Sequence, residues 1–149
     1  MARILVVDSD PQIRKFFAIS LGAGGHKVVE AAAAAEGLAL SVAKKFDLVI
    51  LDLDQPEGDG QDVISALRAN MPVPIIVLSA RSEEGEKVEA LDRGANDFVV
   101  KPFGVGEMLA RIRAALRQGV RARPSVVIAG EVRIDLDRRI ITRGGDRCI

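Results

Sequence analysis

Four side chains whose types suit phosphate and cation chemistry each follow a short apolar run of the sequence. They are two carboxylates, a hydroxyl and an ammonium group, at Asp8, Asp52, Ser79 and Lys101. Carboxylates that lie close together repel, by about 4 kcal/mol at 4 Å and an effective dielectric near 20, so such a pair favours a hard cation such as Mg²⁺. A carboxylate can also act as a nucleophile and form an aspartyl phosphate. Together these residue types predict phosphoryl transfer, in which the ammonium and hydroxyl groups hold the phosphoryl oxygens.

The elements that would position these side chains alternate between short apolar runs and longer helical patterns. Three of the runs consist of Ile, Leu and Val without polar alternation, which is typical of parallel strands buried on both faces. Repeated strand–helix units with right-handed crossovers predict an α/β fold, in which ligands bind beyond the carboxyl ends of the strands. We expect strands at 4–7, 27–30, 48–51, 75–78 and 98–100, and helices near 11–22, 33–45, 60–69, 83–93 and 104–117.

The composition is that of a globular chain whose charge is unevenly spread. The 149 residues are 48% hydrophobic, and the formal net charge at pH 7 is zero. Residues 117–149 carry eight arginines against four acids, which indicates a basic tail near nucleic acid and an acidic body. No apolar run approaches the roughly 20 residues that span a bilayer, and the run at 4–7 is too short for a signal peptide. Since Cys148 is the single cysteine, we expect a cytoplasmic protein.

The sequence changes character after residue 118, which marks a predicted domain boundary. Residues 1–118 hold all of the strand and helix patterns above, and residues 119–125 have the composition of a linker. Residues 126–149 contain three short strand-like runs, which predict a small antiparallel β extension. A sheet of this size is marginally stable alone, so we expect these residues to be part of a second domain.

Four blocks carry the chemistry: ILVVD at 4–8, LDLDQPEGDG at 51–60, LSAR at 78–81 and KPF at 101–103. In this order and at this spacing they resemble the receiver domain of bacterial two-component response regulators. The likeness covers residues 3–117, and the run from Ser79 to Leu116 most resembles the OmpR/PhoB subfamily. The resemblance implies a flavodoxin-like fold, which is a doubly wound five-stranded parallel sheet of order 2-1-3-4-5.

The resemblance also implies how the phosphoryl group is bound. Asp52 would accept it from a sensor histidine kinase. Asp8 and Asp52 would hold Mg²⁺ together with the backbone carbonyl of Asp54. Ser79 would bond the phosphoryl group and draw in the loop after its strand. Lys101 would pair with the phosphoryl group and precede a cis peptide bond.

Three residues depart from the family's pattern. Ser9 stands where the family usually has a second acid that binds the metal, so Mg²⁺ affinity is expected to fall. Asp10 could replace that acid only if the loop shifts, because it is the predicted N-cap of the following helix. Phe98 stands at the switch position, where the subfamily usually has Tyr, so switching would depend on packing. Asp54 adds a carboxylate near the metal, which would partly offset Ser9. We expect reduced phosphorylation.

The subfamily also pairs two receivers through its fourth helix, fifth strand and fifth helix. We expect cross-subunit ion pairs of Lys87 with Glu107 and of Asp92 with Arg111. The tail at 126–149 resembles the first sheet of the subfamily's winged-helix DNA-binding domain. Because no recognition helix follows, DNA binding is expected only in a full-length form. The candidate interface residues are Lys87, Asp92, Asp97, Glu107, Arg111 and Arg117.

Three other functions remain as alternatives. The most serious is a phosphate-independent receiver, or decoy, that keeps the fold and the dimer face, because Ser9 weakens the metal site. A phosphatase of the haloacid-dehalogenase type also has an Asp-x-Asp motif, a Ser and a Lys, but its nucleophile strand comes first. An FMN carrier is disfavoured because the chain has no Trp or Tyr to stack on a flavin. We expect a signalling protein and not an enzyme.

Overall fold

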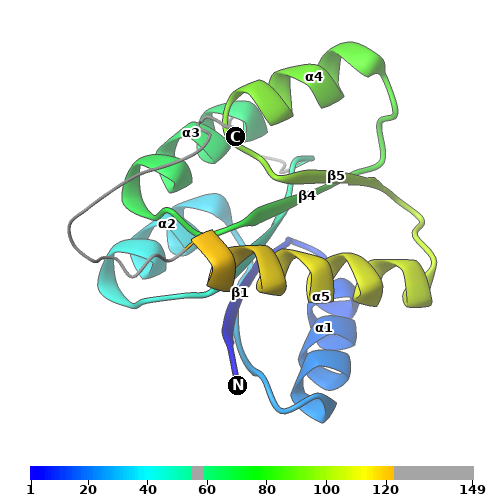
Figure 1. The fold of residues 1–149 in the computed structure, drawn as a ribbon. Helices are drawn as coiled ribbons and strands as arrows, with labels where there is room; N and C mark the ends of the chain where they lie inside the picture. Colours follow the sequence, from blue (N-terminus) through cyan, green and yellow to red (C-terminus); the bar gives the residue numbers. More distant parts are fainter. Residues whose placement is uncertain (55–58, 123–149) are drawn as a thin grey trace. The chain divides into compact units, whose positions relative to one another are not determined.

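The computed structural model describes residues 1–54 and 59–122, which form a three-layered α/β domain. Its five parallel strands have the order β2-β1-β3-β4-β5, so the predicted fold class and strand order are confirmed. Helices α1 and α5 cover one face of the sheet, and α2, α3 and α4 cover the other (Figure 1). The strands are β1 (Arg3–Val7), β2 (Lys27–Ala31), β3 (Leu48–Asp52), β4 (Ile75–Ser79) and β5 (Asp97–Val100). The helices are α1 (Pro11–Ala23), α2 (Ala34–Ala43), α3 (Gly60–Asn70), α4 (Glu84–Asp92) and α5 (Val105–Ala122).

The central strands have apolar side chains on both faces because helices cover both. Alternate residues of β3 enter different cores: Val49 and Leu51 pack toward α3, whereas Leu48 and Ile50 pack toward α1 and α5. All four are fully buried. This double burial explains why the strand sequences lack polar alternation, and it fixes the register of the strands that carry the site.

The strands are slightly longer than the sequence patterns predict, and this affects the functional residues. Asp52 is the last residue of β3, and Ser79 is the last residue of β4, whereas both were expected just after their strands. The backbone of Leu53 still donates to the carbonyl of Leu78 at 2.8 Å, and that of Lys101 donates to the carbonyl of Ser79 at 2.8 Å. The hydrogen-bond ladder therefore continues to Leu53, directly after Asp52, and includes the carbonyl of Ser79.

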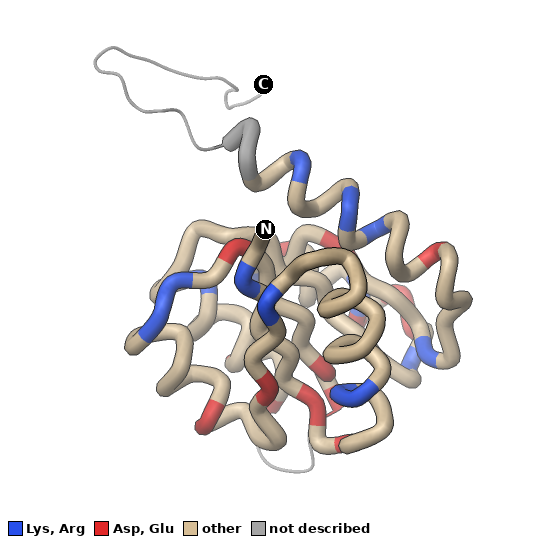
Figure 2. The backbone as a smooth tube through the Cα atoms, turned by 90° about the horizontal axis from the view of Figure 1, so that it is seen from below, with Lys and Arg blue, Asp and Glu red and all other residues tan. Residues whose placement is uncertain are grey.

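Helix α5 runs to Ala122 and carries basic residues along its length (Figure 2). The first residues of the segment predicted as a linker, 119–122, are therefore helical. One compact unit comprises Met1–Gly119. The predicted antiparallel extension at 126–149 lies outside the described residues, and the domain boundaries stay a prediction. None of the described helices is long and apolar enough to cross a membrane.

The side chain of Arg68 in α3 connects the ends of three segments. Its Nη1 donates to the carbonyls of Met71 and Val73 at 3.1 and 2.6 Å, and its Nη2 donates to the carbonyl of Gly94 and to Oδ1 of Asn96 at 2.6 and 2.8 Å. Four acceptors thus depend on one guanidinium group, which holds the loops that precede β4 and β5.

We expect Arg68→Met to lower the free energy of unfolding by about 2–3 kcal/mol, because half-buried acceptors lose their donors while the apolar stem stays. Chemical denaturation followed by circular dichroism measures the loss. The matched control is Arg113→Met at an exposed position of α5. Equal effects of the two substitutions would contradict this role of Arg68.

Candidate functional site

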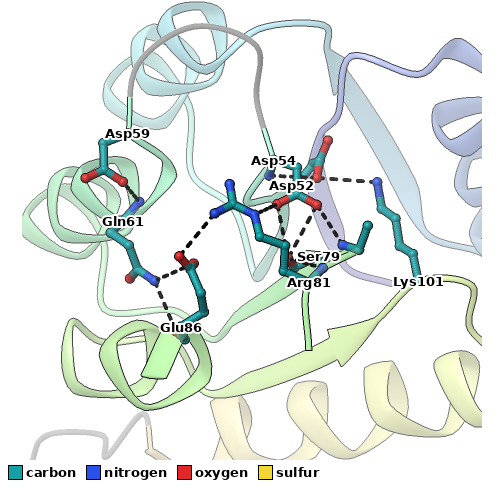
Figure 3. A network of polar contacts seen from close by, with 9 residues as sticks. Asp52, Asp54, Asp59, Gln61, Ser79, Arg81, Glu86 and Lys101 are labelled. Atoms are coloured by element: carbon teal, nitrogen blue, oxygen red, sulfur yellow. Dashed lines mark hydrogen bonds and ion pairs between the residues drawn. The ribbon is translucent and has the colours of Figure 1, made fainter. Parts of the chain in front are cut away.

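The carboxyl ends of β1, β3, β4 and β5 bring together the four side chains that the sequence singles out. The ammonium Nζ of Lys101 lies 3.2 Å from Oδ2 of Asp8 and 3.3 Å from Oδ1 of Asp52. Both aspartates are buried, with residue exposures of 1% and 3%, and Ser79 is fully buried. The predicted convergence of Asp8, Asp52 and Lys101 is therefore observed at one end of the sheet. Figure 3 shows Asp52 and Lys101 with Ser79 on the adjacent strand.

Burial and charge act in opposite directions on this cluster. Burial raises the pKa of Asp52 above its ordinary value and the charge of Asp8 adds to this, although the backbone N–H of Asp54 and the Lys101 ammonium lower it. Burial alone would lower the pKa of Lys101, but the charges of Asp52 and Asp8 raise it above its ordinary value. Lys101 therefore stays protonated, and two buried carboxylates share one ammonium. When both carboxylates are ionised, the three side chains together carry one net negative charge.

Asp8 is held in place by the start of α1. Its Oδ1 accepts from the backbone N–H of Asp10 at 2.9 Å, and its carbonyl accepts from Nη1 of Arg14 at 2.7 Å. The Asp10 side chain caps α1, as predicted, by accepting from the backbone N–H of Gln12 at 2.9 Å. Ser9 between them is exposed. Asp10 is thus engaged elsewhere and does not replace the acid that is missing at position 9.

The comparison with protein families agrees with this arrangement. Residues 4–113 match the family described as the response regulator receiver domain. The chain belongs to this family. It is 45% identical over 146 residues to the KDP operon transcriptional regulatory protein KdpE of Escherichia coli, an alignment that covers 97% of this chain and 65% of that protein. A likeness to KdpE is also predicted by residues 78–84 and 101–107, and it is confirmed.

Further relatives agree. The transcriptional regulatory protein KdpE of Mycobacterium tuberculosis is 45% identical over 122 residues, which cover 82% of this chain and 54% of that protein. A receiver domain of Methanospirillum hungatei, described as CheY-like, superposes with a TM-score of 0.78 at 27% identity, over 82% of this chain and 98% of that one. The chain thus spans between one half and two thirds of the KdpE relatives.

The receiver domain places the Asp54 side chain on the tip of β4. Its carboxylate accepts from Oγ of Ser79 at 3.1 and 3.3 Å and from the backbone N–H of Ala80 at 2.6 Å. The sequence reasoning used only the backbone carbonyl of Asp54 and its charge near the metal, and missed these bonds. One sequence signal could have predicted these bonds: Asp54 is an acid two residues after Asp52, and Ser79 follows the strand expected beside it.

Receiver domains bind Mg²⁺ at the phosphorylation site, and the donor set here fits such an ion in kind. Mg²⁺ in proteins takes one or two carboxylates and keeps several waters. Asp8 and Asp52 provide two buried carboxylates that Lys101 compensates only in part. The described residues contain no group of three His, Cys, Asp or Glu side chains that could hold a metal. The candidate ligands are therefore Asp8, Asp52 and the carbonyl of Asp54, and exposed Ser9 adds no charge.

The cis peptide bond that the resemblance implies is present, and the candidate switch residue Phe98 lies in the core. Phe98 is buried, with 6% exposure, in the core that α3 and α4 cover. The peptide bond between Lys101 and Pro102 is cis. The Phe98 ring has no hydroxyl that could form a hydrogen bond at the surface. Any movement of this residue would therefore act on the core residues that pack against it.

The predicted dimer face contains both ion pairs and exposed apolar side chains. Nη1 of Arg111 bonds both carboxylate oxygens of Asp97 at 2.8 and 2.9 Å, and its Nη2 bonds Glu107 at 2.9 Å. Arg111 is therefore already paired within its own subunit, whereas Lys87 and Asp92 are exposed on α4 and Arg117 is exposed on α5. The exposed large apolar residues of this face are Val88, Leu91, Val100 and Val105.

Proposed function

We propose that this receiver domain takes a phosphoryl group onto Asp52 from the phosphohistidine of a sensor histidine kinase and thereby controls transcription through phosphorylation-dependent dimerisation. The observation that carries the proposal is the contact of one ammonium with two buried carboxylates at the strand tips, at 3.2 and 3.3 Å. Such a group is available to neutralise charge on a phosphorylated Asp52. The group transferred would stay on the protein, so the role is that of a signalling component.

The proposed reaction is an in-line displacement at phosphorus. A carboxylate oxygen of Asp52 forms the new O–P bond while the P–N bond of phosphohistidine breaks, and the histidine nitrogen keeps the electron pair of that bond. Bound Mg²⁺ would neutralise charge on the phosphoryl oxygens. Lys101 and Ser79 would hold these oxygens as donors, and Asp8 would keep Lys101 and the cation in place.

The proposed output is a homodimer through α4, β5 and α5. Four exposed apolar residues on this face would be removed from water on pairing, and charged residues around them would set the register. A two-fold dimer is the usual geometry for such a self-complementary face. We propose that a longer form of the protein, with a complete winged-helix domain, binds DNA, and that the protein acts in the cytoplasm.

Incubation with acetyl phosphate and Mg²⁺, read by intact mass, tests the proposal. The expected result is one phosphoryl group per chain, which does not form when Mg²⁺ is chelated beforehand, with sedimentation that shifts toward a dimer. If the adduct yield does not reach a plateau at any Mg²⁺ concentration that the protein tolerates, the protein is better described as a phosphate-independent receiver, and this proposal is wrong. Steady turnover of p-nitrophenyl phosphate would favour the phosphatase.

Ser9→Asp is expected to raise the Mg²⁺ affinity about tenfold and to increase the adduct yield, because it adds a full charge beside Asp8 at an exposed position. The Mg²⁺ concentration at half-maximal phosphorylation measures the effect. Ser9→Asn, which is similar in shape but uncharged, is the control and should leave this concentration nearly unchanged. Equal behaviour of the two variants would show that position 9 does not reach the cation.

A further inference from the structure

The Asp54 carboxylate occupies hydrogen-bond donors that a phosphoryl group on Asp52 would need. Ser79 Oγ and the Ala80 backbone N–H both donate to it, and Nε of Arg81 lies 3.5 Å from its Oδ1. The backbone N–H of Asp54 in turn donates to Oδ1 of Asp52 at 3.0 Å, so the two aspartates share one strand tip. Figure 3 shows the Asp54 carboxylate directed at the end of β4.

These donors cannot serve two anions at once. A serine hydroxyl has one proton to donate, and a backbone amide has one N–H. The bonds are charge-assisted because the acceptor is ionised, so they are stronger than bonds between neutral groups. A phosphoryl oxygen can therefore take Ser79 Oγ or Ala80 N–H only after the Asp54 carboxylate has left them.

The same carboxylate is the first member of a polar chain that reaches two helices. Arg81 contacts Oε2 of Glu86 in α4 at 3.2 Å. The backbone carbonyl and the carboxylate of Glu86 accept from Nε2 of Gln61 in α3, at 3.0 and 3.4 Å, and Gln61 is buried. A movement of the Asp54 carboxylate away from Ser79 and Ala80 would thus also act on its ion pair with Arg81, next to the helix that begins the proposed dimer face (Figure 3).

We propose that the Asp54 carboxylate competes with the phosphoryl group for the Ser79 and Ala80 donors and thereby lowers phosphorylation. When the phosphoryl group displaces it, the change reaches α4 through the contacts of Arg81 with Asp54 and Glu86. The inference rests on the proposed function, because it names the residue that regulates the same site. It also assigns a role to the one acid of the site that neither holds Lys101 nor accepts the phosphoryl group.

Two readouts test the competition, and the first needs neither metal nor phosphate. Ala80 is exposed, so its N–H should exchange with solvent rapidly unless Asp54 protects it. Hydrogen exchange measured by NMR on the metal-free protein should show a protected Ala80 amide, and Asp54→Ala should lower the protection about tenfold. An unprotected amide in the wild type, or unchanged protection in the variant, would overturn the proposal.

The second readout is the affinity for beryllofluoride in Mg²⁺, measured by titration calorimetry. Asp54→Ala is expected to bind about tenfold more tightly than the wild type, since the donors no longer have to be released. Asp54→Asn keeps the shape and a weaker acceptor and should lie between them. Glu83→Gln removes a charge from the connection between β4 and α4, where the Glu83 side chain forms no cap bond, and controls for simple repulsion of an anion.

The outcomes separate the two proposals. If the wild type binds beryllofluoride and Asp54→Ala binds it equally or more weakly, the competitor is wrong and the proposed function stands. An increase in Glu83→Gln as large as that in Asp54→Ala would also overturn the competition. If no variant binds beryllofluoride, the proposed function fails and the competitor fails with it, whatever the Ala80 exchange shows.

Discussion

Asp52→Asn is expected to abolish the phosphoryl adduct, because an amide nitrogen and its carbonyl cannot replace the carboxylate as a nucleophile toward phosphorus. The substitution keeps the shape of a side chain that is buried at the end of β3, so the fold should be retained. Intact mass after incubation with acetyl phosphate and Mg²⁺ measures the loss, which should be complete within detection.

The matched control for this substitution is Asp62→Asn, which makes the same chemical change at an exposed position of α3. It should leave the adduct at the wild-type level. A remaining adduct in Asp52→Asn, located by peptide mass on Asp8 or Asp54, would show that the strand tips carry a different acceptor.

Lys101→Met is expected to slow phosphorylation about a hundredfold, because it removes the ammonium that contacts both Asp8 and Asp52 and would hold the developing charge on phosphorus. The side chain keeps nearly the same volume. Initial rates with acetyl phosphate, followed by intact mass, measure the change.

The same substitution also tests the electrostatics of the resting site. Two buried carboxylates lose their shared partner, so the free energy of unfolding should fall by about 3 kcal/mol in Mg²⁺-free buffer, and added Mg²⁺ should restore part of it. Lys44→Met, at the exposed end of α2, is the control and should show neither effect. Wild-type stability of Lys101→Met without Mg²⁺ would contradict the charge balance described for Asp8 and Asp52.

The placement of the main site residues could be predicted from the sequence because it depends on chain direction alone. In a parallel sheet all carboxyl ends lie on one edge, so residues after apolar runs must meet there. Asp8, Asp52 and Lys101 are side by side as expected. The Asp10 cap was also predictable, because an acid before proline at a helix start has one common use.

Other features depended on side-chain directions that a sequence pattern does not contain. The choice of the Asp54 carboxylate between the cation site and the tip of β4 is a matter of side-chain conformation, and the Ser79 and Ala80 donors decide it. The pairing of Arg111 with Asp97 across β5 and α5 likewise needs the packed geometry. The length of α5 was underestimated because Gly119 suggests a break, although the helix continues to Ala122.

The hydrogen-bond ladder around Asp52 and Ser79 has a consequence for the speed of signalling. Since the backbone of Leu53 and the carbonyl of Ser79 are already paired in the sheet, we expect the response of the acceptor to phosphate to consist mainly of movements of the buried side chains and of the loop after β4. We expect slower steps to arise outside the sheet, in the connection between β4 and α4 that contains Arg81. Variants that stiffen or loosen this connection would change the rate of the conformational response at α4 without changing the affinity of the site for the phosphoryl group.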